Sequence, residues 1–139
     1  MLPVNVSAFI EAFTRWVRSQ PDIEAVVLVG SHARETATEG SDIDLVVLTH
    51  GPDRYLCDWS WVSVFGEFTA CQRESYGKVT SIRAFYAGGL EVEFGFTMPD
   101  WAAAPIDSGT LRVVAGGIKA LYDPRGIIAR MQQEIRRGM

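Results

Sequence analysis

The sequence predicts an α/β (α+β) protein in which helices pack on a small mixed β-sheet. Two short runs rich in β-branched residues, 23–29 and 43–48, have the pattern of buried strands and are separated by a helical segment. Two further strand patterns, 79–86 and 90–97, are joined at a pair of glycines, which is typical of a hairpin. Early strands separated by helices and then a hairpin indicate a mixed sheet.

The first half of the chain begins with an amphipathic segment. Phe9, Phe13 and Val17 recur at helical spacing, Ser7 is suited to cap the helix and Pro21 to end it. The aromatic residues between 53 and 66 share roughly one helical face, whereas the polar segment that follows shows no clear period. In order, we expect a helix over 7–20, a strand over 23–29, a short helix over 32–38, a strand over 43–48, a helix over 53–66 and irregular chain over 67–77.

The second half begins with the hairpin and ends with a helix. Asp123 followed by Pro124 has the pattern of an N-cap and a first-turn proline, and Ile128, Met131 and Ile135 supply an apolar face after it. We expect strands over 79–86 and 90–97, a loop over 101–109, a short helix over 110–115, a short strand over 118–122 and a last helix that starts from Asp123.

Composition limits the classes of partner. Thirteen Lys and Arg against seventeen Asp and Glu give a net charge of −4, which disfavours nucleic acid and anionic membranes as partners. No apolar run reaches the roughly 18–20 residues of a membrane span, the first 18 residues lack a signal-peptide pattern, and two cysteines are too few for a disulfide scaffold. We therefore expect a cytoplasmic protein with a single domain over residues 1–139.

A candidate phosphate site follows the first strand. Gly30 and Ser31 stand where that strand ends and a helix begins, and backbone N–H groups at such a position bind anions. Glycine lets a phosphate approach the backbone, and the serine hydroxyl adds a donor. Arg34, one turn into the helix, supplies a planar cation for the same anion.

A candidate metal site lies at the start of the second strand. Asp42 and Asp44 are two residues apart, so their carboxylates point to the same face of the strand. Two like charges on one face are explained by a divalent cation between them, and carboxylate oxygens suit Mg²⁺. A phosphate site beside a Mg²⁺ site is the equipment of phosphoryl or nucleotidyl transfer.

A third carboxylate is expected from the second strand of the hairpin. Glu91 and Glu93 alternate there with apolar residues and therefore share the opposite face of the strand. Considered alone, such acids are better explained by a solvent-facing hairpin edge; beside Asp42 and Asp44, a functional role is favoured for one of the two. We choose Glu93 because it lies deeper in the strand, and Glu91 remains the alternative. Lys78, Arg83 and Lys119 are expected to be surface charges.

Together these motifs resemble the DNA polymerase β-like nucleotidyltransferase superfamily, and most closely its small bacterial domains of the antibiotic and minimal types. The resemblance covers residues 29–45 directly and extends to about residue 96 through the later acid; many relatives have glycine where this chain has Glu35. It implies the nucleotidyltransferase fold, a nucleoside triphosphate substrate and two Mg²⁺ ions. The implied site residues are Gly30, Ser31, Arg34 and Ser41 for nucleotide binding, and Asp42, Asp44 and Glu93 for catalysis and metal binding.

The resemblance implies an enzyme that moves a nucleoside monophosphate, AMP from ATP, to an acceptor hydroxyl and releases pyrophosphate. A small-molecule acceptor such as an antibiotic is favoured. The alternative is an antitoxin-type minimal nucleotidyltransferase that binds or nucleotidylates a helical partner protein. A catalytically silent nucleotide-binding domain is disfavoured because all three carboxylates are present. A homodimer that completes the cleft is a further expectation.

Overall fold

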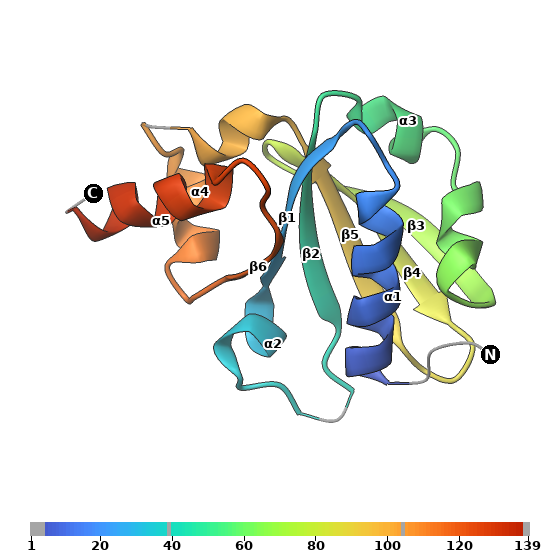
Figure 1. Cartoon of the computed structure of the whole chain (residues 1–139). Helices are drawn as coiled ribbons and strands as arrows, with labels where there is room; N and C mark the ends of the chain where they lie inside the picture. The colour runs from blue at the N-terminus through green and yellow to red at the C-terminus, as the bar shows by residue number, and fades with distance from the viewer. Residues whose placement is uncertain (1–4, 39, 104, 138–139) are drawn as a thin grey trace.

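A six-stranded sheet forms the centre of the computed structural model, which describes residues 5–38, 40–103 and 105–137 (Figure 1). The strand order is β3-β4-β5-β2-β1-β6; β2 and β5 run parallel, and the other neighbouring strands are antiparallel. The predicted mixed sheet with packed helices is therefore confirmed. In chain order the elements are α1 (Val6–Arg18), β1 (Ile23–Val29), α2 (Gly30–Arg34), β2 (Ile43–Thr49), α3 (Pro52–Leu56), the 3₁₀ helix η1 (Ser60–Phe65), β3 (Phe68–Tyr76), β4 (Val79–Tyr86), β5 (Glu91–Thr97), the 3₁₀ helix η2 (Pro99–Ala102), α4 (Ser108–Val114), β6 (Lys119–Tyr122) and α5 (Ile127–Arg136).

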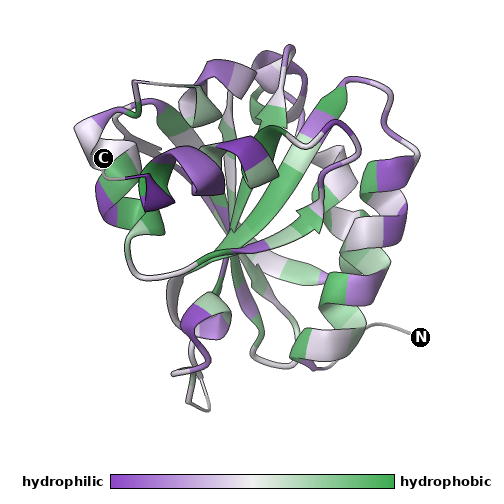
Figure 2. Cartoon of the chain, turned by 60° about the vertical axis from the view of Figure 1, so that its left-hand side comes forward, coloured by the Kyte–Doolittle hydropathy of each residue, from purple (hydrophilic) through white to green (hydrophobic). Residues whose placement is uncertain are grey.

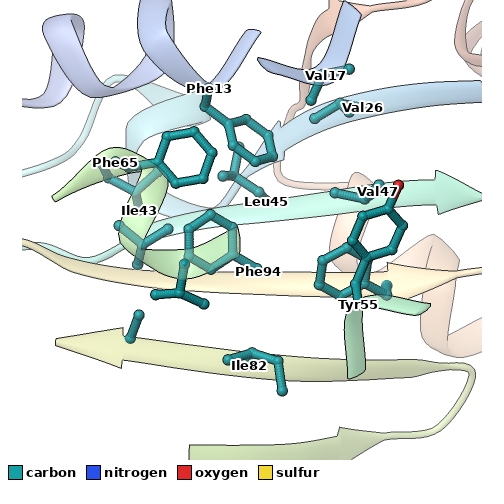
Figure 3. Packing of buried hydrophobic residues seen from close by; sticks show 14 of the residues in the cluster. Phe13, Val17, Val26, Ile43, Leu45, Val47, Tyr55, Phe65, Ile82 and Phe94 are labelled. Atoms are coloured by element: carbon teal, nitrogen blue, oxygen red, sulfur yellow. The ribbon is translucent and has the colours of Figure 1, made fainter. Parts of the chain in front are cut away.

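One face of the sheet is covered by α1, α3 and η1. Phe9 and Phe13 of α1 are fully buried, because residues four apart lie on the same side of a helix. The Phe13 ring lies 5.4 Å from that of Phe65 in η1 and 5.5 Å from that of Phe94 in β5 (Figure 3). Burial of each such ring contributes about 1.5–3 kcal/mol to folding. This aromatic core fixes α1 and η1 on the first face.

The second face is only partly covered. Trp101 of η2 and Ile128 and Met131 of α5 pack on side chains of β1 and β2, such as Val27 and Val46. Figure 2 shows hydrophobic strands at the centre and hydrophilic residues on the helices around them. A cavity of about 690 Å³ lies on this face, and residues of β2, β4 and β5 line it together with residues of α4. The uncovered part of the sheet is therefore where a ligand can reach the strands.

Several expected boundaries are close to those observed, and two segments are wrong. The helix over 7–20, the strands over 23–29 and 43–48 and the hairpin are confirmed within a few residues. The segment 67–77, expected to be irregular, is strand β3. Its side chains are mostly exposed because it pairs with β4 on one side and forms an edge of the sheet, and an edge strand carries polar residues that give little alternation.

The single helix predicted over 53–66 is also wrong, because the segment forms α3 and η1 with a break between them. The break is stabilised by two tryptophans. The Trp59 indole N–H donates to the carbonyl of Leu56 at 2.7 Å, and the Trp61 indole N–H donates to that of Tyr55 at 2.9 Å. Carbonyl groups that end α3 thus find side-chain donors instead of further helical N–H groups.

Two helix starts also differ from expectation. α2 begins at Gly30 and ends at Arg34, two residues earlier than the predicted start and four before the predicted end. α5 begins at Ile127, and the Asp123 carboxylate accepts hydrogen bonds from the backbone N–H groups of Ile128 and Ala129 at 3.2 and 3.1 Å. The predicted N-cap is therefore wrong: Gly126 is the N-cap residue and Pro124 precedes the helix, although Asp123 still binds N–H groups of the first turn.

Within the described ranges, no helix combines the length and the apolar character that crossing a lipid bilayer requires.

Candidate active site

Acidic side chains from two distant parts of the sequence lie side by side on the second face. Asp44 of β2 is paired in register with Glu93 of β5, and Asp42 stands immediately before β2. Glu93 is paired on its other side with Arg83 of β4. Because adjacent strands are about 4.8 Å apart, Asp44, Glu93 and Arg83 form a row across three strands.

Gly30 places the start of α2 against this row. Its φ of 74° is in the left-handed region that favours glycine. A Cβ at this position would collide with Oδ2 of Asp44. Gly30 is therefore required both for the sharp turn from β1 into α2 and for the close approach of the Asp44 carboxylate to the backbone.

Arg83 connects the acidic side chains. Its guanidinium donates to Oδ2 of Asp42 at 3.1 Å, to Oε2 of Glu91 at 2.6 Å and to Oε1 of Glu74 at 3.1 Å, and it also bonds Glu93. Its side chain is only 18% exposed, so the expectation of a surface charge is wrong. One cation thus faces four carboxylates, and the cluster keeps an excess of negative charge.

Burial and this excess of charge raise the pKa values of the two acids that are paired in register. Burial, together with the negative charges of Asp42 and Glu93, raises the pKa of Asp44 to about 7. The pKa of Glu93 is also raised, chiefly by burial, although Arg83 opposes the shift. Asp44 therefore favours a nearby cation or a proton near neutral pH, and the pKa of Glu93 is shifted in the same direction, as is common at active sites.

The donor set suits a hard divalent cation. Asp42, Asp44 and Glu93 all line the same cavity and offer only carboxylate oxygens, the ligands that Mg²⁺ prefers. Among the residues that the structure describes, no group of three or more acids, histidines or cysteines is already arranged to hold a metal ion. Because Asp42 and Glu93 both bond Arg83, coordination requires these carboxylates to turn from the guanidinium toward a common centre.

The four residues predicted to bind nucleotide are in different positions. Gly30 and Arg34 line the cavity beside the carboxylates. The Ser41 hydroxyl accepts a hydrogen bond from the backbone N–H of Thr38 at 2.9 Å, so it shapes the loop that leads into β2. The carbonyl of Ser31 accepts from the N–H of Thr36 at 3.0 Å. Gly30 and Arg34 thus have the more direct access to a ligand, and the roles of Ser31 and Ser41 stay predictions.

Residues 10–87 match the family model of the nucleotidyltransferase domain. This chain belongs to the nucleotidyltransferase domain family. The predictions of the superfamily and of an enzyme of the nucleotidyltransferase class are thereby confirmed. The matched segment of this nucleotidyltransferase domain contains Gly30, Asp42, Asp44 and Arg83, and it ends before Glu93. The choice of Glu93 as the third carboxylate therefore depends on the sheet register and on its position in the cavity lining.

Comparison with solved structures shows the fold in a known protein. An aminoglycoside 6-adenyltransferase from Bacillus subtilis superposes with a TM-score of 0.55 and 14% identity over 73% of this chain and 37% of that one. The Cid1 poly(U) polymerase and a cytoplasmic RNA terminal U-transferase each give a TM-score of 0.45 and 20% identity over 65% of this chain, and 28% and 29% of theirs. This nucleotidyltransferase domain thus spans little more than a third of these proteins or less. No curated protein matches its sequence significantly.

Sequence reasoning missed the central position of Arg83 in this nucleotidyltransferase domain. A signal was present, because Ser81 and Arg83 alternate with the apolar residues Ile82 and Ala84. Such alternation places an arginine on the opposite face from the core, as it does for Glu91 and Glu93. The alternation does not predict the register of β4 against β5. That register places Arg83 beside Glu93.

Proposed function

We propose that this chain transfers a nucleoside monophosphate, AMP from ATP, to the hydroxyl group of a small-molecule acceptor such as an antibiotic, with release of pyrophosphate. The observation that carries the proposal is the register between Asp44 and Glu93. It brings acids from two separate strands together beside Asp42 and next to Gly30. A cluster of carboxylates beside a glycine turn is suited to a metal-bound triphosphate.

In the proposed reaction, the acceptor oxygen forms a bond to the α-phosphorus, and the bond from that phosphorus to pyrophosphate breaks. Glu93 accepts the hydroxyl proton, a role that its raised pKa supports. Gly30 and Arg34, with Ser31 and Ser41, hold the triphosphate. Asp42, Asp44 and Glu93 are the residues that would hold Mg²⁺, as two ions. When bound, the metal would neutralise negative charge on the phosphate oxygens.

The cavity has a volume of about 690 Å³, which is in the range typical of small-molecule sites and suits the nucleoside triphosphate. A small-molecule acceptor is supported by a solved structure. The aminoglycoside 6-adenyltransferase that shares the fold is named for an acceptor of this class. A single domain over residues 1–139, a cytoplasmic location, and a homodimer or a helical partner protein stay predictions that this proposal includes but does not require.

The proposal is tested by incubating the protein with labelled ATP and MgCl₂ against a panel of antibiotics and candidate proteins. We expect the wild-type protein to transfer the label to a small molecule. Asp42→Asn removes one metal-ligand charge and should reduce transfer by about a hundredfold or more, with an unchanged melting temperature. Label on a helical protein instead would favour the antitoxin-type alternative.

Asp53→Asn is the matched control, because Asp53 is an exposed aspartate of α3 away from the cavity. It should transfer label at the wild-type rate. Wild-type transfer by Asp42→Asn would contradict the assigned role of the carboxylate cluster.

A further inference from the structure

The turn between α4 and β6 lies against the last residue of α2. β6 pairs antiparallel with β1, and Lys119 at its start is opposite Leu28, one residue before the end of β1. The segment that leads into β6 therefore runs beside the helix that follows β1. Gly116 and Gly117 are part of this segment, and Arg34 is the residue of α2 that they meet.

Arg34 extends along the backbone of this glycine pair. A Cβ at Gly116 would be 3.0 Å from Cδ, 3.3 Å from Nη1 and 3.8 Å from Nε of Arg34, and these are the three nearest heavy atoms beyond its chain neighbours. A Cβ at Gly117 would be 3.8 Å from Cγ of the same side chain. Because neither residue carries a side chain, the arginine can lie directly on the turn from Cγ to the guanidinium.

The two glycines are explained differently. Gly117 has a φ of 108°, in the left-handed region, so the backbone conformation alone favours glycine there. Gly116 is outside that region, and its backbone does not exclude alanine. The atoms that a side chain at position 116 would first meet are those of Arg34. The glycine at 116 is therefore explained by the position of Arg34.

A fixed position of Arg34 is useful for binding an anion. Arg34 is exposed and lines the cavity together with Gly30 and Asp44. An exposed arginine side chain adopts many rotamers, and fixing it on a ligand costs that freedom. Packing along the turn removes part of the freedom before the ligand arrives, so the guanidinium can present its paired donors to a phosphate.

We propose that Gly116 is a positioning residue: it leaves room for the Arg34 side chain on the α4–β6 turn and so holds the guanidinium at the cavity for the triphosphate. This inference rests on the proposed function. The segment matched by the family model, residues 10–87, ends well before Gly116. The inference thus extends nucleotide binding to a part of the chain that its sequence marks only as a break between a helix and a strand.

The test is a double-mutant cycle on the binding of a non-hydrolysable ATP analogue, α,β-methylene ATP, with MgCl₂, measured by isothermal titration calorimetry. Arg34→Ala should weaken binding roughly tenfold or more, the range of a hydrogen bond between charged groups. Gly116→Ala displaces Arg34 from the turn and should weaken binding roughly three- to tenfold. In the Arg34→Ala protein, Gly116→Ala should have no further effect, because the side chain that it displaces is gone.

Gly51→Ala is the matched control, since a Cβ at Gly51 would meet no atom within 4 Å beyond its chain neighbours and its φ of −128° suits alanine. It should bind the analogue like the wild type. Gly116→Val carries a larger side chain and should weaken binding more than Gly116→Ala does. In the transfer assay, Gly116→Ala should raise the KM for ATP and leave the KM for the acceptor unchanged.

The outcomes separate this inference from the proposed function. If the wild type binds the analogue and Gly116→Ala binds it equally well, the positioning role is wrong and the proposed function stands. A loss from Gly116→Ala that is equally large with and without the Arg34 side chain would mark a merely structural glycine and overturn the inference. A raised KM for the acceptor in place of ATP would also overturn it. If the wild type does not bind the analogue at all, the proposed function fails and the inference fails with it.

Discussion

Arg83 is the residue on which the charge balance of the site depends. A guanidinium has five donors in a planar arrangement, which allows one side chain to serve several carboxylates at once. Here it bonds Asp42, Glu74, Glu91 and Glu93. These carboxylates include the expected metal ligands Asp42 and Glu93, so Arg83 and a divalent ion compete for the same carboxylate oxygens.

We expect Arg83→Gln to destabilise the metal-free protein by on the order of 2 kcal/mol, because it leaves partly buried carboxylates without their cation. The same change should tighten binding of Mn²⁺ severalfold, since the acids no longer bond a competing cation. Thermal unfolding in EDTA and calorimetric titration with MnCl₂ measure the two effects.

Arg73→Gln serves as the control, because Arg73 is an exposed arginine of β3; both of its readouts should match the wild type. Weaker Mn²⁺ binding by Arg83→Gln would mean that the guanidinium helps to build the metal site and does not compete for its ligands.

At the residue scale, the sequence predicts what local spacing determines. Asp42 and Asp44 share a face because they are two residues apart, and no knowledge of the fold is needed. The same rule places Glu91 and Glu93 together but does not choose between them, since only the register against β2 pairs Glu93 with Asp44. Glu35, which stands where many relatives have glycine, has a φ of 61°. This left-handed conformation favours glycine, so the departure from the family pattern falls at a position of backbone strain.

Asp22 joins three elements on the side of the sheet away from the acids. The Tyr55 hydroxyl of α3 donates to both of its carboxylate oxygens at 2.8 and 2.9 Å, and the Thr49 hydroxyl of β2 donates to Oδ2 at 2.8 Å. Arg54 forms an ion pair with the same carboxylate. Burial acts to raise the pKa of Asp22, but the hydrogen bonds from Thr49 and Tyr55 outweigh it, so the pKa is lowered below 3.8. The turn before β1 is thereby fixed to α3.

The lowered pKa gives a pH dependence of definite sign. The ionised form of Asp22 is favoured by folding, so its contribution is present above the unfolded pKa of 3.8 and is lost as the pH falls through the folded pKa. We expect Asp22→Asn to lower the free energy of unfolding by about 1–3 kcal/mol above pH 5, and the difference from the wild type to disappear toward pH 2. Thermal melts at successive pH values measure this difference.

Asp100→Asn, which changes an exposed aspartate of η2, is expected to follow the wild-type pH profile closely. If the difference in the free energy of unfolding between Asp22→Asn and the wild type persisted unchanged at pH 2, the contribution of Asp22 would come from packing and neutral hydrogen bonds and not from its charge.

At the element scale, strong periodicity was sufficient for α1, β1, β2 and the β4–β5 hairpin. β3 and the α3–η1 break were not predictable in the same way. The polar edge strand β3 owes its conformation to pairing with β4, a tertiary contact that leaves little trace in its own sequence. The break after α3 depends on which carbonyl groups the tryptophan indoles reach, and that requires the folded chain.

The whole molecule divides into a closed face and an open one. The aromatic side chains of the core under α1, Phe9, Phe13, Phe65 and Phe94, are buried, and none of them lines the cavity. The opposite face is closed over β1 by η2 and α5 but is hollow over β4 and β5, where α4 and the β3–β4 turn stand at its two margins. Ligand binding should therefore slow amide hydrogen exchange on the open face only.

We expect α,β-methylene ATP with MgCl₂ to slow amide hydrogen exchange in residues 109–113 of α4 and 76–79 at the β3–β4 turn, two segments that contribute to the cavity lining. A ligand that binds only the folded, closed-up form stabilises it by mass action, and local opening of the cavity margins becomes rarer. Exchange in α1 should stay unchanged except through global unfolding, because Phe9 and Phe13 are packed on the far face. Mass spectrometry of peptides from these segments, with EDTA as the control that removes the effect, makes the comparison. Protection centred on α1 in place of α4 would locate the ligand on the wrong face of the sheet for any transfer chemistry at Asp44 and Glu93.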